Sequence, residues 1–123
     1  MLNKNQKFGI KAEIFAAKLL RKRGYKIIKQ NYRTKFGEID IIAKEKDTIV
    51  FVEVKARSNE NFGNPKLGVN KKKQKQISMV ALYYLKTTNQ SKAKARFDVV
   101  SFSLKTDTPK IEIIKNAFEL AYS

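Results

Sequence analysis

The spacing of apolar residues near the start of the chain predicts an amphipathic helix from about residue 6 to residue 22. Apolar residues recur at intervals of three and four, as one helical face requires: Phe8, Ala12, Phe15, Ala16 and Leu19. Gly24 follows at the place where a glycine commonly ends a helix.

Three β-rich segments come next. They read YKIIKQNYR (25–33), EIDIIA (38–43) and TIVFVEVK (48–55), and the polar stretches TKFG and KEKD separate them. This pattern predicts three strands, the last two forming a hairpin. Residues 56–69, ARSNENFGNPKLGV, are rich in Asn and Gly and hold the first proline, so a long mobile loop is expected there.

The second half of the chain predicts a helix and two further strands. Asn70 can cap a helix that runs to about Thr87. Its expected core stripe is Ile77, Val80, Ala81, Tyr84 and Leu85. The strands are RFDVVSFSL (96–104) and KIEIIK (110–115), with a turn at TDTP between them, and the tail NAFELAYS is expected to add a last turn. The order αβββαββ predicts one α/β domain over residues 1–123.

Residue types that are absent narrow the chemistry. The chain has no cysteine and no histidine, which excludes thiol nucleophiles, disulfides, histidine bases and most zinc sites. Catalysis would depend on carboxylates, lysines and cations that prefer oxygen ligands, such as Mg²⁺ or Mn²⁺. No apolar run is long enough to span a membrane and the first residues lack a signal-peptide pattern, so a cytoplasmic protein is expected.

The charge of the chain is strongly positive. Lys and Arg number 27 against 11 Asp and Glu, for a formal charge of +16. A field of this sign favours a polyanion such as nucleic acid. Because most of the basic residues are lysines, codon bias would also account for the charge, so charge alone leaves both interpretations open. An acidic membrane surface fits less well, because no helix has a basic face opposite an aromatic one.

The strand TIVFVEVK carries a carboxylate among apolar residues. Alternation places Glu53 and Lys55 on the same face as Phe51. If residues 44–47 form the hairpin turn, Asp40 lies opposite Phe51 and diagonal to Glu53, at roughly 7 to 8 Å. Two carboxylates so placed can share one cation. The alternative is that Lys55 simply neutralises Glu53 at a sheet edge.

Two further groups bear on this choice. Glu13 has no basic neighbour on its own helix, so it is either a solvated boundary residue or a third acid near the other two. Lysines gather at the start of the second helix, where a bound phosphate would offset their repulsion from the helix dipole. A solvated charge run explains them equally well. Gln74 is expected either to cap backbone or to reach a site.

Several short motifs together resemble one family. Phe8-Gly9 with Glu13, Gly37-Glu38-Ile39-Asp40, Val52-Glu53-Val54-Lys55 and Arg96-Phe97-Asp98 occur in the order found in the YraN-like proteins. These are small members of the restriction-endonuclease-like PD-(D/E)xK superfamily, which also includes archaeal Holliday-junction resolvases. The resemblance covers about residues 8–100. It implies an αβββαβ core with a mixed central sheet flanked by helices.

The resemblance also implies a catalytic site. Its catalytic residues fall on Glu13, Asp40, Glu53, Lys55 and Gln74. The metal ligands for Mg²⁺ or Mn²⁺ would be Asp40, Glu53, the Val54 carbonyl and Glu13. Ile39 stands where the superfamily signature has proline, a position that is not a ligand. The residues expected to contact nucleic acid are Arg33, Lys35, Arg57, Lys71, Lys72, Lys73 and Lys75.

The expected function is therefore a metal-dependent DNA endonuclease, with branched or junction DNA from repair or recombination as its substrate. Cleavage of a two-fold symmetric junction predicts a homodimer, and repair or recombination proteins are the expected partners. The main alternative is a nucleic-acid-binding module that keeps the nuclease fold without catalysis. A basic RNA-associated or ribosome-associated protein is a third interpretation.

Overall fold

The computed structural model describes residues 2–57, 69–105 and 108–119. They form, in chain order, α1 (Lys4–Lys22), β1 (Lys26–Thr34), β2 (Gly37–Glu45), β3 (Thr48–Arg57), α2 (Lys71–Thr87), β4 (Ala95–Lys105) and β5 (Thr108–Phe118). The predicted order αβββαββ is confirmed. Most of the predicted loop at 56–69, namely residues 58–68, lies outside the described residues.

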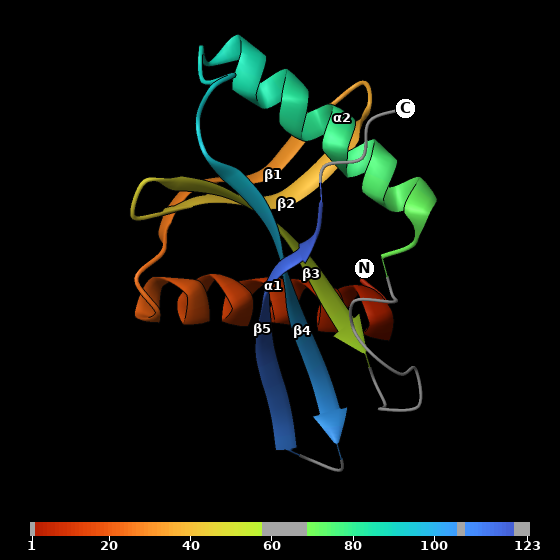
Figure 1. Ribbon diagram of the computed structural model, residues 1–123. Coiled ribbons are helices and arrows are strands. Elements are labelled where there is room, and N and C mark those ends of the chain that lie inside the picture. Colours follow the sequence, from red (N-terminus) through yellow and green to blue (C-terminus); the bar gives the residue numbers. More distant parts are fainter. Residues whose placement is uncertain (1, 58–68, 106–107, 120–123) are drawn as a thin grey trace.

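The five strands form one mixed sheet in the order β1-β2-β3-β4-β5. Neighbouring strands are antiparallel except β3 and β4, which are parallel. A parallel pair needs a long crossover, and α2 supplies it. In Figure 1 the sheet passes between α1 and α2, which lie on its opposite sides. The predicted mixed sheet flanked by helices is therefore confirmed.

Alternate residues of β3 enter two separate apolar clusters. Ile49 and Phe51 pack with α2, whereas Val50 and Val52 pack with α1. The predicted core stripe of α2 is buried in full. On α1 the buried stripe contains Leu20 and Ala17, while Leu19 is only half-buried, so that predicted face was slightly misplaced.

The β2–β3 hairpin differs from the predicted register by two residues. Its turn is only Lys46 and Asp47, because Glu45 pairs with Thr48. The prediction that Ala43 pairs with Thr48, which set Asp40 opposite Phe51, is therefore wrong. A shift of two residues preserves the face of every side chain. The pair Ile41–Val52 places Asp40 next to Glu53, closer than the predicted diagonal.

The end of the chain also differs from expectation. The predicted turn in the tail is wrong for residues 116–118, which belong to β5. Phe118 stacks on Phe97 with ring centroids 4.7 Å apart, and this contact supports the longer strand. Among the helices in the described part of the chain, none is long and apolar enough to cross a membrane.

Candidate active site

Asp40 lies where β2 and β3 separate. The last pair between these strands is Ile41 with Val52, beyond which β3 continues beside β4. Asp40 Oδ2 accepts a hydrogen bond of 2.8 Å from the Val54 backbone N–H. The Asp40 side chain thus pairs with the Val54 N–H, which the backbone of β2 would have paired with if the β2–β3 ladder continued. This bond holds the Asp40 carboxyl beside β3.

Glu53 is a buried acid without a matching base. Only 7% of the residue is exposed, and its Oε2 is fully buried with no hydrogen-bond partner among the described residues. Burial, followed by the nearby charge of Asp40, raises the pKa of Glu53 to about 8. Burial also raises the pKa of Asp40, although the bond from Val54 opposes the shift. Each of the two carboxyl groups therefore affects the pKa of the other.

The lysines near Asp40 and Glu53 offset only part of the rise in the Glu53 pKa. Lys73 on α2 places its Nζ 3.9 Å from Glu53 Oε1, at the edge of ion-pair distance. Lys55, which shares the Glu53 face of β3, acts at longer range, and both lysines lower the Glu53 pKa. Because the Glu53 pKa is still raised, burial and the Asp40 charge outweigh the two cations.

A second set of acids lies beside the first. Burial raises the pKa of Glu13 on α1, and the charges of Asp40 and Glu38 raise it further. Glu38 forms an ion pair of 3.4 Å with Arg33. With its amide oriented to donate to both acids, the Asn31 nitrogen lies 3.1 Å from Glu13 Oε1 and 3.0 Å from Glu38 Oε1. Glu13 therefore lies within electrostatic range of Asp40, which agrees with the second of the two alternatives that the sequence left open.

Asn31 and Glu38 were not predicted as site residues. Asn31 occupies the register position opposite Asp40, between the pairs Gln30–Ile41 and Tyr32–Ile39. Its backbone has a positive φ of 53°. Asn is one of the few residues that adopt this conformation readily. One sequence signal for Asn31 was an asparagine within a strand-like segment, where this residue is unfavourable.

The other predicted residues take several positions. Gln74 donates to the Val69 carbonyl at 2.7 Å, so it caps backbone, one of its two predicted roles. Asn70 accepts from the Lys73 N–H and begins α2 as predicted. The remaining lysines of this cluster, which are Lys71, Lys72 and Lys75, are exposed, as are Arg33 and Lys35. The Arg57 side chain lies outside the described residues.

The donor set fits a hard divalent cation. Carboxylates and a backbone carbonyl are the ligands that Mg²⁺ and Mn²⁺ prefer, and the unpartnered Glu53 Oε2 leaves one such oxygen unused. Among the described residues no three acidic side chains gather closely enough to enclose a metal ion. Mg²⁺ is commonly held by only one or two carboxylates, with water and substrate phosphate completing its shell.

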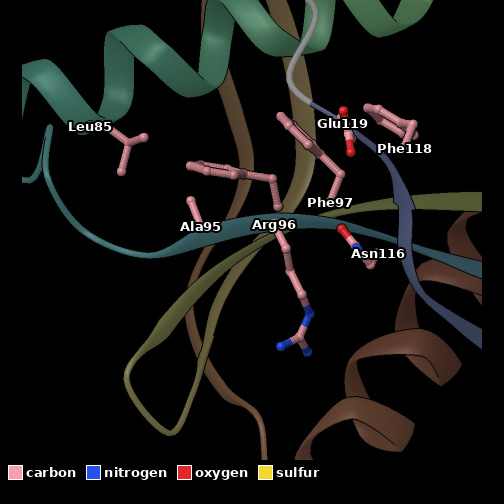
Figure 2. A pocket seen from close by; sticks show the side chains of 8 residues that line it. Leu85, Ala95, Arg96, Phe97, Asn116, Phe118 and Glu119 are labelled. Carbon is pink, nitrogen blue, oxygen red and sulfur yellow. The ribbon is translucent and has the colours of Figure 1, made fainter.

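A small apolar cavity lies elsewhere on the sheet. It has a volume of about 180 Å³, and its lining includes Phe51, Leu85, Phe97 and Phe118. Figure 2 shows the Arg96 side chain pointing away from these groups, across β4. Since Glu53 and Asp40 are not part of its lining, this cavity is a gap in packing rather than part of the site.

Comparisons with known proteins place the chain in a family. The family model described as "Uncharacterised protein family UPF0102" matches residues 12–102. A UPF0102 protein of Syntrophus aciditrophicus is 51% identical over 98% of this chain and 95% of its own length. A second, from Desulfosudis oleivorans, is 50% identical over 97% of this chain and 95% of its own.

One solved structure is also similar, that of Pyrococcus furiosus SfsA in complex with Ca²⁺. It is 12% identical with a TM-score of 0.34, over 85% of this chain and 58% of that chain. The chain belongs to the UPF0102 family, the YraN-like group of restriction-endonuclease-like proteins.

Proposed function

We propose that this UPF0102 protein is a metal-dependent endonuclease that hydrolyses phosphodiester bonds in DNA. The observation that carries the proposal is the carboxyl pair of the half-buried Asp40 and the buried Glu53, in which one Glu53 oxygen has no partner among the described residues. Burying two like charges together is costly for folding. In a chain with 27 basic residues, such a pair without a close cation is typical of a site that binds a charged ligand.

Each residue of the site has a role in this proposal. Asp40 and Glu53 hold Mg²⁺ or Mn²⁺ together with the Val54 carbonyl. Bound there, the cation would supply Lewis-acid charge for activating water and neutralising the phosphate. Lys55 stabilises the negative charge that develops on the phosphate. Glu13 orients the attacking water, and Asn31 fixes the position of Glu13 by its hydrogen bond.

The surface beside the site supports a nucleic-acid substrate. Lys73 approaches Glu53 from the first turn of α2, and the exposed Lys71, Lys72 and Lys75 surround it. Backbone N–H groups at a helix start and nearby lysines both attract phosphate. We extend the proposal to branched or junction DNA from repair or recombination. Because a junction needs two symmetric cuts, junction resolution would require a dimer.

Cleavage assays test the proposal. Purified protein is incubated with branched, flapped, single-stranded and duplex DNA in Mg²⁺, Mn²⁺ or EDTA. We expect cleavage in either metal and none in EDTA. Asp40→Asn and Glu53→Gln should abolish cleavage while DNA binding remains. Asp47→Asn is the matched control, because Asp47 is an exposed acid paired with Lys94 at 3.1 Å, and it should cleave normally.

The same assays separate the alternative function. DNA binding without cleavage under any metal would overturn the endonuclease proposal and favour a non-catalytic nucleic-acid-binding module. Preference for A-form RNA duplex over branched DNA would favour the RNA-associated function.

A further inference from the structure

One exposed face of α2 combines lysines with apolar side chains. Residues spaced by three and four lie on this face, opposite the buried stripe: Lys72, Lys75, Gln76, Met79, Leu82, Tyr83 and Lys86. Its centre is apolar and open to solvent, since Met79 is 47% exposed, Leu82 38% and Tyr83 42%. The lysines lie toward the two ends of the stripe.

The tip of the β1–β2 hairpin packs beside this face and forms two hollows with it. The Phe36 and Tyr83 rings meet edge to face, with centroids 6.1 Å apart. One hollow of about 280 Å³ is lined by Arg33, Thr34, Lys35 and Tyr83. The other, of about 240 Å³, is lined by Phe36, Met79, Leu82, Tyr83 and Lys86. Tyr83 therefore divides a basic hollow from an apolar one.

The hairpin tip is held firmly against α2. Gly37 has a φ of 144° and approaches Gln76 so closely that a Cβ there would lie 2.9 Å from the Gln76 Cγ. Tyr32 of β1 also meets the buried Tyr84 edge to face at 5.3 Å. The two hollows are thus built between packed elements.

Charge decides between possible occupants of this surface. A second copy of a chain with charge +16 would bring lysines against lysines around the apolar centre. A nucleic acid would be attracted by the same lysines, and each base has an apolar face that stacks on aromatic rings. Lys35 already lies over the Phe36 ring, 5.3 Å from its centroid, which keeps a cation beside the place where a base would stack.

We infer that this surface, defined by Arg33, Lys35, Phe36, Met79, Leu82, Tyr83 and Lys86, binds unpaired nucleotides. The bases stack against Tyr83 and Phe36, and the flanking cations contact the phosphates. The inference rests on the proposed function in one respect, because it makes the substrate a DNA with a single-stranded segment next to the cleaved bond.

The dimensions agree with this arrangement. Asp40 is three residues along β2 from Gly37, or about 10 Å at 3.4 Å per residue. From Lys72 to Lys86 the stripe on α2 is about 21 Å long at 1.5 Å per residue. The hairpin tip therefore begins about 10 Å from Asp40, which a short single-stranded segment next to the cleaved bond can span.

Binding measured in EDTA tests the inference without any cleavage. The probes are a fluorescently labelled duplex and the same duplex with a six-nucleotide single-stranded flap, compared by anisotropy at one salt concentration. We expect wild type to prefer the flapped DNA. Tyr83→Leu, which removes the stacking ring but keeps an apolar side chain, should weaken flap binding between about fivefold and a hundredfold. Duplex binding should change little.

Two control variants make the result specific. Tyr83→Phe keeps the ring and should retain the flap preference. Ile14→Ala removes an apolar side chain that is 52% exposed on α1, and it should bind both probes like wild type. Because Tyr83 is exposed, the variants should fold normally, which thermal melts check.

Other outcomes would overturn the inference. One is a wild-type protein that binds both probes equally; another is a Tyr83→Leu variant that loses both equally. A wild-type dimer in sedimentation that dissociates in Tyr83→Leu would instead assign the surface to self-association. Flap preference without any cleavage would refute the endonuclease proposal and leave the nucleotide-binding surface supported.

Discussion

Two groups of acids on the same sheet differ in whether all of their carboxylate oxygens have hydrogen-bond partners. Asp98 on β4 is completely buried, yet both of its oxygens have partners. Arg96 donates to it at 3.0 and 3.2 Å, the Tyr25 hydroxyl at 2.8 Å and the Asn116 N–H at 2.9 Å. Glu53 is also buried and lies beside the half-buried Asp40, but one Glu53 oxygen has no partner in the described chain.

The neighbours of each group account for the contrast. Arg96 also reaches Glu45 at 2.6 Å, and Lys115 reaches the same carboxylate at 3.0 Å. Hydrogen bonds from these two bases hold the pKa of Glu45 below its ordinary value, and the acids around Arg96 raise the pKa of the guanidinium. At Glu53 the nearest base, Lys73, is 3.9 Å away.

Under the proposed function, the difference separates charges that stabilise the fold from charges that bind a ligand. Around Arg96 the sequence supplies a cation for the acids, so folding is enough to satisfy them. At Asp40 and Glu53 the compensation is incomplete, and a bound cation would complete it. A perturbed pKa alone would not make the distinction, because both groups have one. What differs is whether the partners are already present.

Removing Arg96 should have the largest effect on folding. Arg96→Met leaves the buried Asp98 without a compensating charge, at a cost of about 3 to 5 kcal/mol in the free energy of unfolding. Urea melts measure it. Lys94→Met is the matched control, since Lys94 pairs with Asp47 on the surface and its removal should change the free energy of unfolding far less. Equal losses in the two variants would show that the Arg96 cluster is not a structural charge network.

Replacing Glu53, unlike replacing Arg96, should not lower the free energy of unfolding in the absence of metal. Above about pH 8, where Glu53 is ionised, Glu53→Gln relieves repulsion from Asp40, so in EDTA the variant should be as stable as wild type or more stable. Mg²⁺ or Mn²⁺ should stabilise wild type by about 2.7 kcal/mol at a hundredfold excess over Kd, and the variant much less. Glu112→Gln, an exposed acid on β5, should keep the metal response. A large loss of stability for Glu53→Gln in EDTA would mean that Glu53 neutralises a lysine instead.

Local patterns accounted for most of the fold. The buried stripe of α2 follows directly from helical spacing, and its cap at Asn70 from a side chain that can bond the helix start. Alternation along β3 correctly placed Glu53 on the face of Phe51, away from Val52. That assignment is correct although the predicted register of the hairpin is wrong, because a shift of two residues leaves every side chain on the same face of the sheet.

The errors arose where distant residues or rare conformations decide the outcome. The two-residue turn needs a positive φ of 55° at Lys46, a conformation for which lysine gives no signal. The contact of Lys73 with Glu53 joins a helix to a strand across the loop between them, and no local spacing predicts it. The stacking of Phe118 on Phe97 likewise extended β5 beyond its predicted end.

The dependence of stability on pH should distinguish the two groups most finely. Glu53 has a pKa of about 8 in the folded protein against 4.5 ordinarily, so the folded state holds more protons between these values. In EDTA the free energy of unfolding should therefore fall as pH rises from about 4.5 to about 8, by at most about 1.4 kcal/mol per pH unit.

Glu45 contributes a pH dependence of stability with the opposite sign. Its lowered pKa stabilises the fold above its ordinary value, and this contribution is lost as pH falls through the folded pKa, below about 4.5. The chain has no histidine or cysteine, so no side chain with an ordinary pKa near 7 adds to the titration between pH 6 and 8. In that range Glu53→Gln should flatten the decline, and saturating Mg²⁺ should flatten it in wild type by keeping Glu53 ionised. Melts at several pH values measure both, and a wild-type decline that persists unchanged in Glu53→Gln would assign the titration to a group other than this carboxyl.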